Sequence, residues 1–195
     1  MNHSTGDFRA GPRLITIFAQ LRIAGVLSPQ LFARPGQAAV LDLRVPSLHS
    51  APFQQAVDKL GARQLAGARV CINEGSTFKR RTHAIPITAA GGSASVIVDS
   101  GATGTLVAAE SQIARALESR SIDGHHTQGL GGAAESYRIV PAVEIRRAGA
   151  SAVVDLTIGK SPGPSCGPDG LLGMDALHEC LLVLGESAFG MACTR

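Results

Sequence analysis

The chain has 195 residues, of which 45% are hydrophobic and 17% charged, so it can form one domain with an extension or two small domains. With no Trp, one Tyr, 23 Gly and 10 Pro, its core must be aliphatic, and short strands with turns are favoured over long helices. The net charge of +3 comes without a basic run or interleaved aromatic residues, which argues against nucleic-acid binding.

The first 82 residues contain no catalytic motif, and we expect them to form an extension of mixed α/β structure. An apolar stretch at 14–27 is interrupted by Arg22, so it gives no firm evidence of a membrane span. Basic residues before this stretch fit a secretory signal, whereas Gln20 and Arg22 argue against one. The sequence leaves the compartment open between cytoplasm and periplasm.

Within this extension the predicted elements are short. Apolar residues favour strands at 39–41 and 68–72. Ser50, followed by Pro52 and by apolar residues at helical spacing, indicates the start of a helix that Gly61 weakens. The extension would either pack on the core as an arm or bind a partner.

The second half of the chain opens with a predicted hairpin that leads into an acidic corner. Its strands are expected at 84–88 and 94–98, around a glycine turn. The second strand runs into Asp99, and Ser100 and Gly101 then break it. Such a corner holds one carboxylate at the end of a rigid strand, as a functional site requires, although these residue types also suit an ordinary turn.

The elements expected after this corner continue the pattern of short strands. They are strands at 105–107, 137–140, 143–145 and 151–158, a helix at 111–117, a short helix at 175–180 and a closing hairpin at 181–193.

A second motif, Leu171-Leu172-Gly173, lies between a proline-rich loop and the predicted short helix. Together with the Asp-Ser-Gly-Ala motif at 99–102, it resembles the retropepsin-like aspartic proteases, the single-domain relatives of pepsin. The resemblance implies a mainly β fold, a closed β-barrel with one short C-terminal helix. It divides the chain into an extension at 1–82 and a protease domain at 83–195.

The resemblance also implies a role for each motif residue. The acid is catalytic and its two neighbours shape the catalytic loop, a small residue and a glycine-rich flap contact the substrate, and the second motif supports the loop from below. The catalytic group is Asp99, Ser100 and Gly101. The residues in contact with substrate are Ala102, Gly129, Gly131 and Gly132. The residues that support the loop are Leu171, Leu172 and Gly173.

Peptide hydrolysis of this kind needs two carboxylates, one acting as base and one as acid across a shared water. The chain has a single Asp-Ser/Thr-Gly triplet and no internal repeat. We therefore expect a homodimer in which two copies of Asp99 face each other across a two-fold axis. The expected substrate is a polypeptide, with no cofactor and no metal.

Other candidate sites have weaker support. The segment 129–134 fits a dinucleotide-binding pattern, but no strand precedes it, and Ser100 does not lie in a nucleophile elbow. The adjacent histidines at 125–126 are interpreted as an exposed pair and not as metal ligands. Asp175 is interpreted as a helix-capping acid and Asp169 as a turn residue.

The four cysteines form no C-x-x-C pair, which argues against a zinc site and leaves disulfides open. Cys180, in an apolar context predicted to be helical, is interpreted as a small buried hydrophobic residue.

The interpretation carried forward is an aspartic endopeptidase that works as a homodimer. One alternative is a binding module on the same fold that holds a peptide without cutting it. Another is an interaction protein whose function lies in residues 1–82. The intact triplet at 99–101 favours the enzyme, because a pure binder does not need it.

Overall fold

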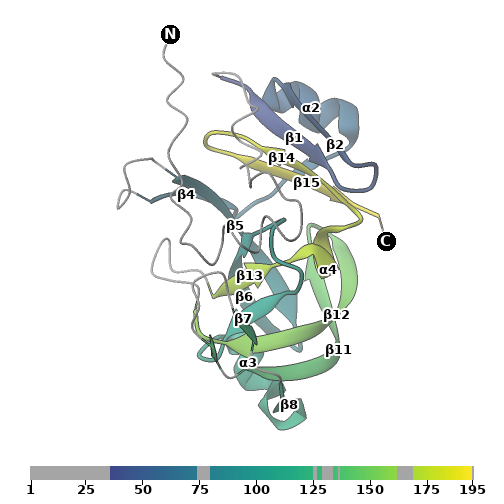
Figure 1. Cartoon of the computed structure of the whole chain (residues 1–195). Coiled ribbons are helices and arrows are strands. Elements are labelled where there is room, and N and C mark those ends of the chain that lie inside the picture. The colour runs from purple at the N-terminus through teal and green to yellow at the C-terminus, as the bar shows by residue number, and fades with distance from the viewer. Residues whose placement is uncertain are drawn as a thin grey trace, which may run out of the picture.

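A computed structural model shows that most described residues lie in two large β-sheets (Figure 1). The structure describes residues 36–73, 80–124, 127–128, 134–135, 137–161 and 169–194. An eight-stranded sheet forms the lower body in Figure 1, and a five-stranded sheet with a helix lies above it. The apolar stretch at 14–27 and the predicted flap glycines lie outside the described residues.

The eight-stranded sheet closes on itself because β5 also pairs with β11, where Thr88 lies opposite Arg146. Six strands thereby form a closed barrel, with β4 (Arg69–Asn73) continuing beyond β5 and β8 (Ile122–Asp123) beyond β11. In their order around the barrel the six are β5 (Arg80–Ala89), β6 (Gly92–Val98), β13 (Gly170–Leu172), β7 (Leu106–Ala108), β12 (Ala150–Gly159) and β11 (Arg138–Arg147). A separate two-stranded sheet contains β9 (Thr127–Gln128) and β10 (Ala134–Glu135).

The hairpin of β5 and β6 brings the chain to the acidic corner. Its turn residues Ala90 and Gly91 both have positive φ, at 50° and 77°, as expected of a two-residue turn that matches the twist of the strands. Along β6, Ala94 and Val96 are buried while Ser93 is exposed. This alternation turns one face of β6 into the barrel core and fixes the register of the strand that ends before Asp99.

The five-stranded sheet joins the two ends of the described chain. Its strand order is β2 (Ser47–Ala51), β1 (Ala38–Asp42), β14 (Cys180–Leu184), β15 (Phe189–Cys193) and β3 (Arg63–Gln64). Helix α2 (Phe53–Leu60) ends at Gly61, which adopts the left-handed conformation of a helix C-terminus. The predicted extension and the closing hairpin thus share one sheet, and the domain boundary near residue 82 stays a prediction.

The five-stranded sheet is covered on both faces. One face packs on the barrel core through residues such as Leu182, Phe189 and Met191. The other face packs on α2. Its residues Val40 and Val183 belong to a second apolar cluster that also contains residues of this helix. Part of the N-terminal extension therefore serves as a core-packing arm, one of the two roles predicted for it.

The structure confirms the mainly β fold with few helices that the sequence predicted. Besides α2 they are α3 (Gln112–Leu117), followed by the 3₁₀ turn η2 (Glu118–Arg120), and α4 (Met174–Leu177). The hydroxyl of Ser111 caps α3 by accepting from the Ala114 amide at 3.1 Å.

Two local predictions are wrong. Ser50 is not a helix N-cap, because it belongs to β2, opposite Ala39, and its hydroxyl donates to Gln37. The helix begins later, after Pro52. Cys180 is buried as expected, but it is not helical, because it begins β14 and forms a disulfide with Cys193 at the end of β15.

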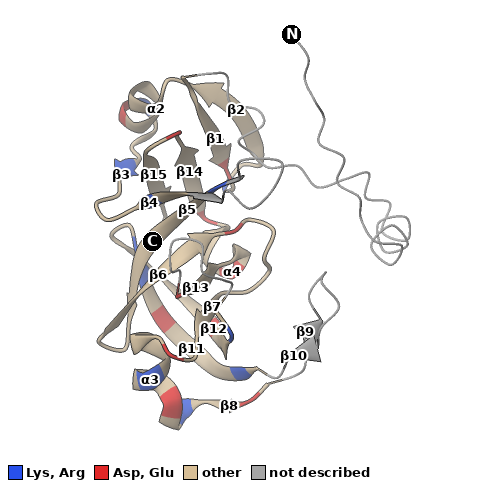
Figure 2. Cartoon of the chain, turned by 90° about the vertical axis from the view of Figure 1, so that its left-hand side faces the viewer, with Lys and Arg blue, Asp and Glu red and all other residues tan. Residues whose placement is uncertain are grey.

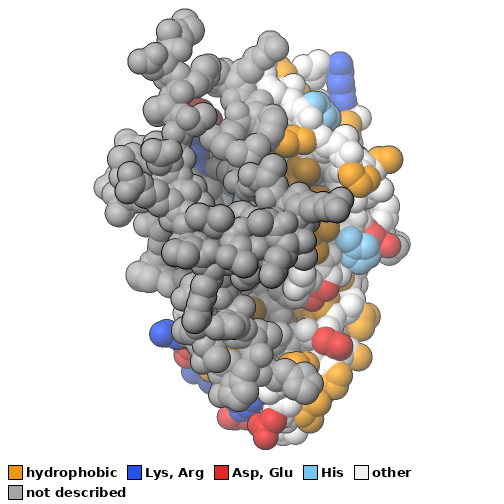
Figure 3. All heavy atoms as spheres, in the orientation of Figure 1, with side chains coloured by type: hydrophobic (Ala, Val, Ile, Leu, Met, Phe, Trp, Pro, Cys, Tyr) orange, Lys and Arg blue, Asp and Glu red, His pale blue; other side chains and the backbone are white. Residues whose placement is uncertain are grey.

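The charged residues of the described chain are distributed over many elements (Figure 2). On the part of the face in Figure 3 that is not grey, hydrophobic and acidic side chains alternate over short distances. Among the described residues, no helix combines the length and apolar character needed to cross a membrane.

Candidate active site

Asp99 directly follows the last residue of β6, at a position where the neighbouring strand β13 is still paired with the chain. The Asp99 amide donates to Leu172 O at 3.0 Å, so the parallel ladder between β6 and β13 reaches the acid itself. The Ala102 amide then donates back to Asp99 O at 3.2 Å and closes a tight turn. The backbone of Asp99 is therefore fixed on both sides.

The Asp99 side chain is oriented by this same turn. The Gly101 amide donates to Asp99 Oδ1 at 2.9 Å, and Asp99 itself is half-buried. A Cβ added to Gly101 would lie 3.2 Å from the same oxygen, which is a crowded distance. Glycine at this position lets the main chain approach the carboxylate closely enough to donate to it.

Strand β13 is short and inserted between two others. It runs parallel to β6 and antiparallel to β7. A Cβ at Gly170 would overlap Leu106 O, so only glycine fits where β13 passes β7. Leu172 is fully buried in the barrel core, whereas Leu171 is only half-buried.

Helix α4 follows β13 and holds the loop that continues from Asp99. The Met174 amide donates to Ala102 O at 2.8 Å, and the Asp175 amide donates to Thr103 O at 3.1 Å. Gly173, between the strand and the helix, lies so close to the loop that a Cβ would overlap Gly104 O. The two sequence motifs, far apart in the chain, are thus hydrogen-bonded neighbours.

A side-chain clamp completes the loop. Asp175 accepts from the Thr105 amide at 2.9 Å and from the Thr105 hydroxyl at 2.6 Å. The same hydroxyl accepts from the Gly173 amide at 3.2 Å, and Thr105 is fully buried. We call residues 99–105 the Asp99 loop, and Thr105 with Asp175 the loop clamp.

The comparison with protein families adds a decisive finding at this point. Residues 85–176 match the family model described as Aspartyl protease. These residues form an aspartyl protease domain. A search of curated proteins found no match to the chain.

The match confirms the family resemblance that the motifs at 99–102 and 171–173 indicated. The matched residues begin in β5 and end in α4, so the protease domain contains the barrel, the Asp99 loop and the loop clamp. The strands β1, β2, β3, β14 and β15 lie outside the match.

The loop clamp corrects one prediction about the protease domain. Asp175 does not cap its helix, because Gly173 is the N-cap and the Asp175 carboxylate binds Thr105 instead. Thr105 was missed, since a threonine before a strand carries no local signal for a bond to a distant carboxylate. The one signal for this bond in the sequence is Asp175, an acid that follows the second motif and has no local partner.

The other predicted site residues are placed as follows. Ser100 and Ala102 are half-buried in the Asp99 loop of the protease domain. Gly129, Gly131 and Gly132 lie outside the described residues. The roles predicted for all of these residues in the protease domain stay predictions.

Asp169 is the remaining acid near the second motif, and it has its own partner. Its carboxylate accepts from the Ser95 amide at 2.9 Å, and its own amide donates to Ser95 O at 2.6 Å. It therefore joins the entry of β13 to the middle of β6. Both acids beside the second motif are engaged in the framework of the protease domain, whereas the Asp99 carboxylate accepts from the amide of Gly101 in its own loop.

Proposed function

We propose that the chain is an aspartic endopeptidase whose active unit is a homodimer, with one Asp99 carboxylate from each subunit. The observation that supports this most directly is the Asp99 loop, in which a half-buried carboxylate is oriented by the Gly101 amide and the backbone is held by β13 and α4. Within a domain of the aspartyl protease family, this is the arrangement that would present one carboxylate to a partner.

The mechanism follows from bringing two such carboxylates together. Two carboxylates within hydrogen-bond distance cannot both ionise easily, so the pair holds one proton between them. The ionised Asp99 would take a proton from a bound water as that water attacks the scissile carbonyl. The protonated Asp99 would donate to the carbonyl oxygen, and the proton taken from water would pass to the leaving amine.

The requirement for a second chain rests on the described acids. Asp169 binds Ser95 and Asp175 binds Thr105, so neither replaces a second Asp99 within one subunit. The sequence contains no second Asp-Ser/Thr-Gly triplet. The second catalytic carboxylate must then come from another copy, related by a two-fold axis near the Asp99 loop.

The five-stranded sheet constrains how that dimer forms. Strand β14 is paired on both sides, by β1 and β15, and β15 is also paired with β3 at Gly190 and Met191. Partner strands therefore cannot add to β14 without displacing a pairing of the same chain. We propose that the subunits meet through the Asp99 loop and its surroundings.

The predicted contacts to substrate complete the proposal. Ala102 is a small residue three positions after Asp99 and would leave room for an extended peptide beside the carboxylates. The glycines at 129, 131 and 132 would belong to a segment that closes over the peptide, a role the sequence alone supports.

A subunit-mixing experiment tests both parts of the proposal. Asp99→Asn should abolish cleavage of an extended peptide while the melting temperature stays near that of the wild type. When wild-type and Asp99→Asn subunits are mixed in equal amounts and exchanged, activity per wild-type chain should fall to about half, since only half of those chains find an intact partner.

The control is Asp58→Asn, which changes an exposed acid on α2 that bonds only to Gln54 of the same helix among the described residues. It should leave cleavage unchanged alone and in mixtures. Cleavage that survives Asp99→Asn would overturn the protease assignment. Activity per wild-type chain that stays constant in the mixture would overturn the shared site, and specific binding of the peptide without any cleavage would favour a binding module.

A further inference from the structure

Helix α4 is too short to hold its own position. It contains four residues, Met174–Leu177, and a single helical turn is unstable in isolation because nucleation is costly. Yet its first residues fix Ala102 O and Thr103 O of the Asp99 loop, and its Asp175 forms the loop clamp with Thr105. The position of the loop therefore depends on what holds α4 from its other end.

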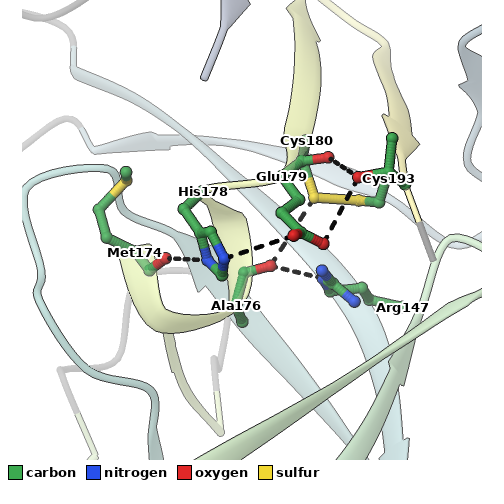
Figure 4. A network of polar contacts seen from close by, with 8 residues as sticks. Arg147, Met174, Ala176, His178, Glu179, Cys180 and Cys193 are labelled. Carbon is green, nitrogen blue, oxygen red and sulfur yellow. Dashed lines mark hydrogen bonds and ion pairs between the residues drawn. A yellow bond between two sulfur atoms is a disulfide. The ribbon is translucent and has the colours of Figure 1, made fainter. Parts of the chain in front are cut away.

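That end is held by a buried arginine from the barrel. Arg147, the last residue of β11, is 2% exposed, and its Nε donates to Ala176 O at 2.6 Å. Figure 4 shows the side chain reaching the Ala176 carbonyl from the barrel side, with Glu179 and the disulfide of Cys180 beside it. A cation at the C-terminal end of a helix also interacts favourably with the helix dipole.

A role in packing alone does not explain a charged residue at this place. Taking a guanidinium out of water costs several kcal/mol, which an apolar side chain of similar volume would avoid. Moreover, Arg147 Nη1 has no hydrogen-bond partner among the described residues. The compensation must come from the Ala176 carbonyl and from nearby negative charge.

Two carboxylates of the α4 region supply that charge. Burial lowers the pKa of the Arg147 guanidinium, and the charges of Glu179 and Asp175 act in the opposite direction. Asp175 is the acid of the loop clamp, so the Arg147 cation and the clamp influence each other through their charges. The neighbouring Arg146, by contrast, points outward with a 74% exposed side chain.

We propose that Arg147 is a positioning residue for the Asp99 loop, which it supports by holding the C-terminal end of α4 through Ala176 O. The inference rests on the proposed function only for its effect on catalysis. A chain of hydrogen bonds then runs from Arg147 on β11 through α4 and Thr105 to the loop that presents Asp99.

The test compares variants of the chain in the full-length protein. Arg147→Met removes the cation, Arg147→Lys keeps a cation and a donor, Thr105→Val removes the clamp hydroxyl, and Thr105→Ser keeps it. At a temperature where each variant is folded, Arg147→Met and Thr105→Val should lower kcat by tenfold to about a hundredfold with little change in KM, as small misplacements of reacting groups do. Arg147→Lys and Thr105→Ser should keep most of the wild-type kcat.

Two neighbours provide matched controls. Arg146→Met changes the exposed arginine next to Arg147, and Thr82→Val removes a buried hydroxyl that has no hydrogen-bond partner among the described residues. Both should leave kcat unchanged. A double-mutant cycle of Arg147→Met with Asp175→Asn should give a combined loss in kcat well below the product of the single losses.

Amide hydrogen exchange gives a readout that needs no substrate. Exchange at Gly101, which donates to Asp99, should quicken in Arg147→Met and Thr105→Val and stay unchanged in the two controls. Unchanged exchange in the loop, or equal losses of kcat in Arg147→Met and Arg146→Met, would overturn the inference.

If wild-type cleavage proves independent of Asp99, the proposed function fails while the exchange measurement still decides the role of Arg147. If Arg147→Met does not fold, Arg147→Lys decides the role of Arg147. Slow amide exchange in the loop of Arg147→Lys together with a near-normal kcat supports the inference. Fast exchange in that loop with a normal kcat refutes it.

Discussion

The barrel around the Asp99 loop and the five-stranded sheet above it are held together by different kinds of contact. The loop is fixed by directional hydrogen bonds from β13, α4 and the loop clamp. The sheet, besides the pairing of its own strands, is fixed by apolar burial on both faces and by the disulfide between Cys180 and Cys193. Hydrogen bonds set positions narrowly, whereas apolar burial supplies cohesion without strict direction.

This difference indicates a division of labour. The matched family segment, residues 85–176, contains every contact described for the Asp99 loop. The sheet supplies a cover, because Leu182, Phe189 and Met191 complete the barrel core from outside that segment. Variants in the barrel should therefore change the chemistry, and variants in the sheet should mainly change stability.

The largest effect is expected from truncating matched leucines in the two regions. Leu172→Ala in β13 and Leu182→Ala in β14 each remove a fully or almost fully buried side chain. Each should lower the free energy of unfolding by about 2 to 5 kcal/mol, measured by denaturant titration. Only Leu172→Ala should also lower kcat sharply, because Leu172 O accepts the Asp99 amide and β13 leads directly into α4.

The activity comparison must be made at a temperature where both variants are folded. Equal losses of kcat in Leu172→Ala and Leu182→Ala would remove the distinction between the two regions. A Leu172→Ala variant that melts like the wild type would show that the leucine does not support the loop.

A somewhat smaller effect is expected from opening the disulfide in the sheet. Cys180 and Cys193 are 13 residues apart and close the open end of the β14–β15 hairpin. The double variant Cys180→Ala/Cys193→Ala should lose about 3 kcal/mol of stability, since a loop of this length is no longer constrained in the unfolded chain. Its kcat should fall less than that of Leu172→Ala.

The control for the disulfide is reduction of the wild-type protein, followed by the same melting measurement. Cys71 is also disulfide-bonded, so reduction should lower the melting temperature at least as far as the double variant does. A double variant as stable as the oxidised wild type would show that strand pairing and apolar burial hold the hairpin without the disulfide.

Much of the barrel was predictable because its signals are local. The strands predicted at 84–88 and 94–98, the glycine turn between them and the helix predicted at 111–117 each depend on residues close in sequence, and the structure has β5, β6 and α3 there. The family motifs likewise indicated the hydrogen-bonded contact between residues 99–102 and 171–174. Apart from this contact, which the family resemblance supplied, the physical cause acts within one element or one hairpin.

The missed features depend on contacts between distant segments. Ser50 looked like a helix start because Pro52 follows it, but pairing with Ala39 in β1 holds it in a strand. Cys180 looked helical because its apolar neighbours fit either structure, and only pairing of β14 with β1 and β15 decides for a strand. The loop clamp joins Thr105 to Asp175, and no local pattern announces such a bond.

The smallest expected effect concerns the contact between the two regions. His83 on β5 is 2% exposed, its Nε2 donates to Gly185 O at 2.9 Å, and its ring lies 5.5 Å from that of Phe189. Gly185 follows β14 and Phe189 begins β15, so this histidine joins the barrel to the sheet. The pKa of His83 is lowered, because burial disfavours the charged ring and the Arg81 charge acts in the same direction, against the Gly185 bond.

The sign of the resulting pH dependence follows from this direction. The unfolded chain takes up the His83 proton near its ordinary pKa of 6.5, while the folded chain keeps the ring neutral to lower pH. The stability tied to a neutral His83 is therefore complete above pH 6.5 and is lost as the pH falls toward the lower pKa of the folded state. In melting curves at pH 7.5, 6.5 and 5.5, His83→Gln should lose less stability on acidification than the wild type, whereas His49→Gln, on the exposed part of β2, should follow the wild type. Parallel losses in all three proteins would mean that the contact between barrel and sheet does not respond to protonation of His83.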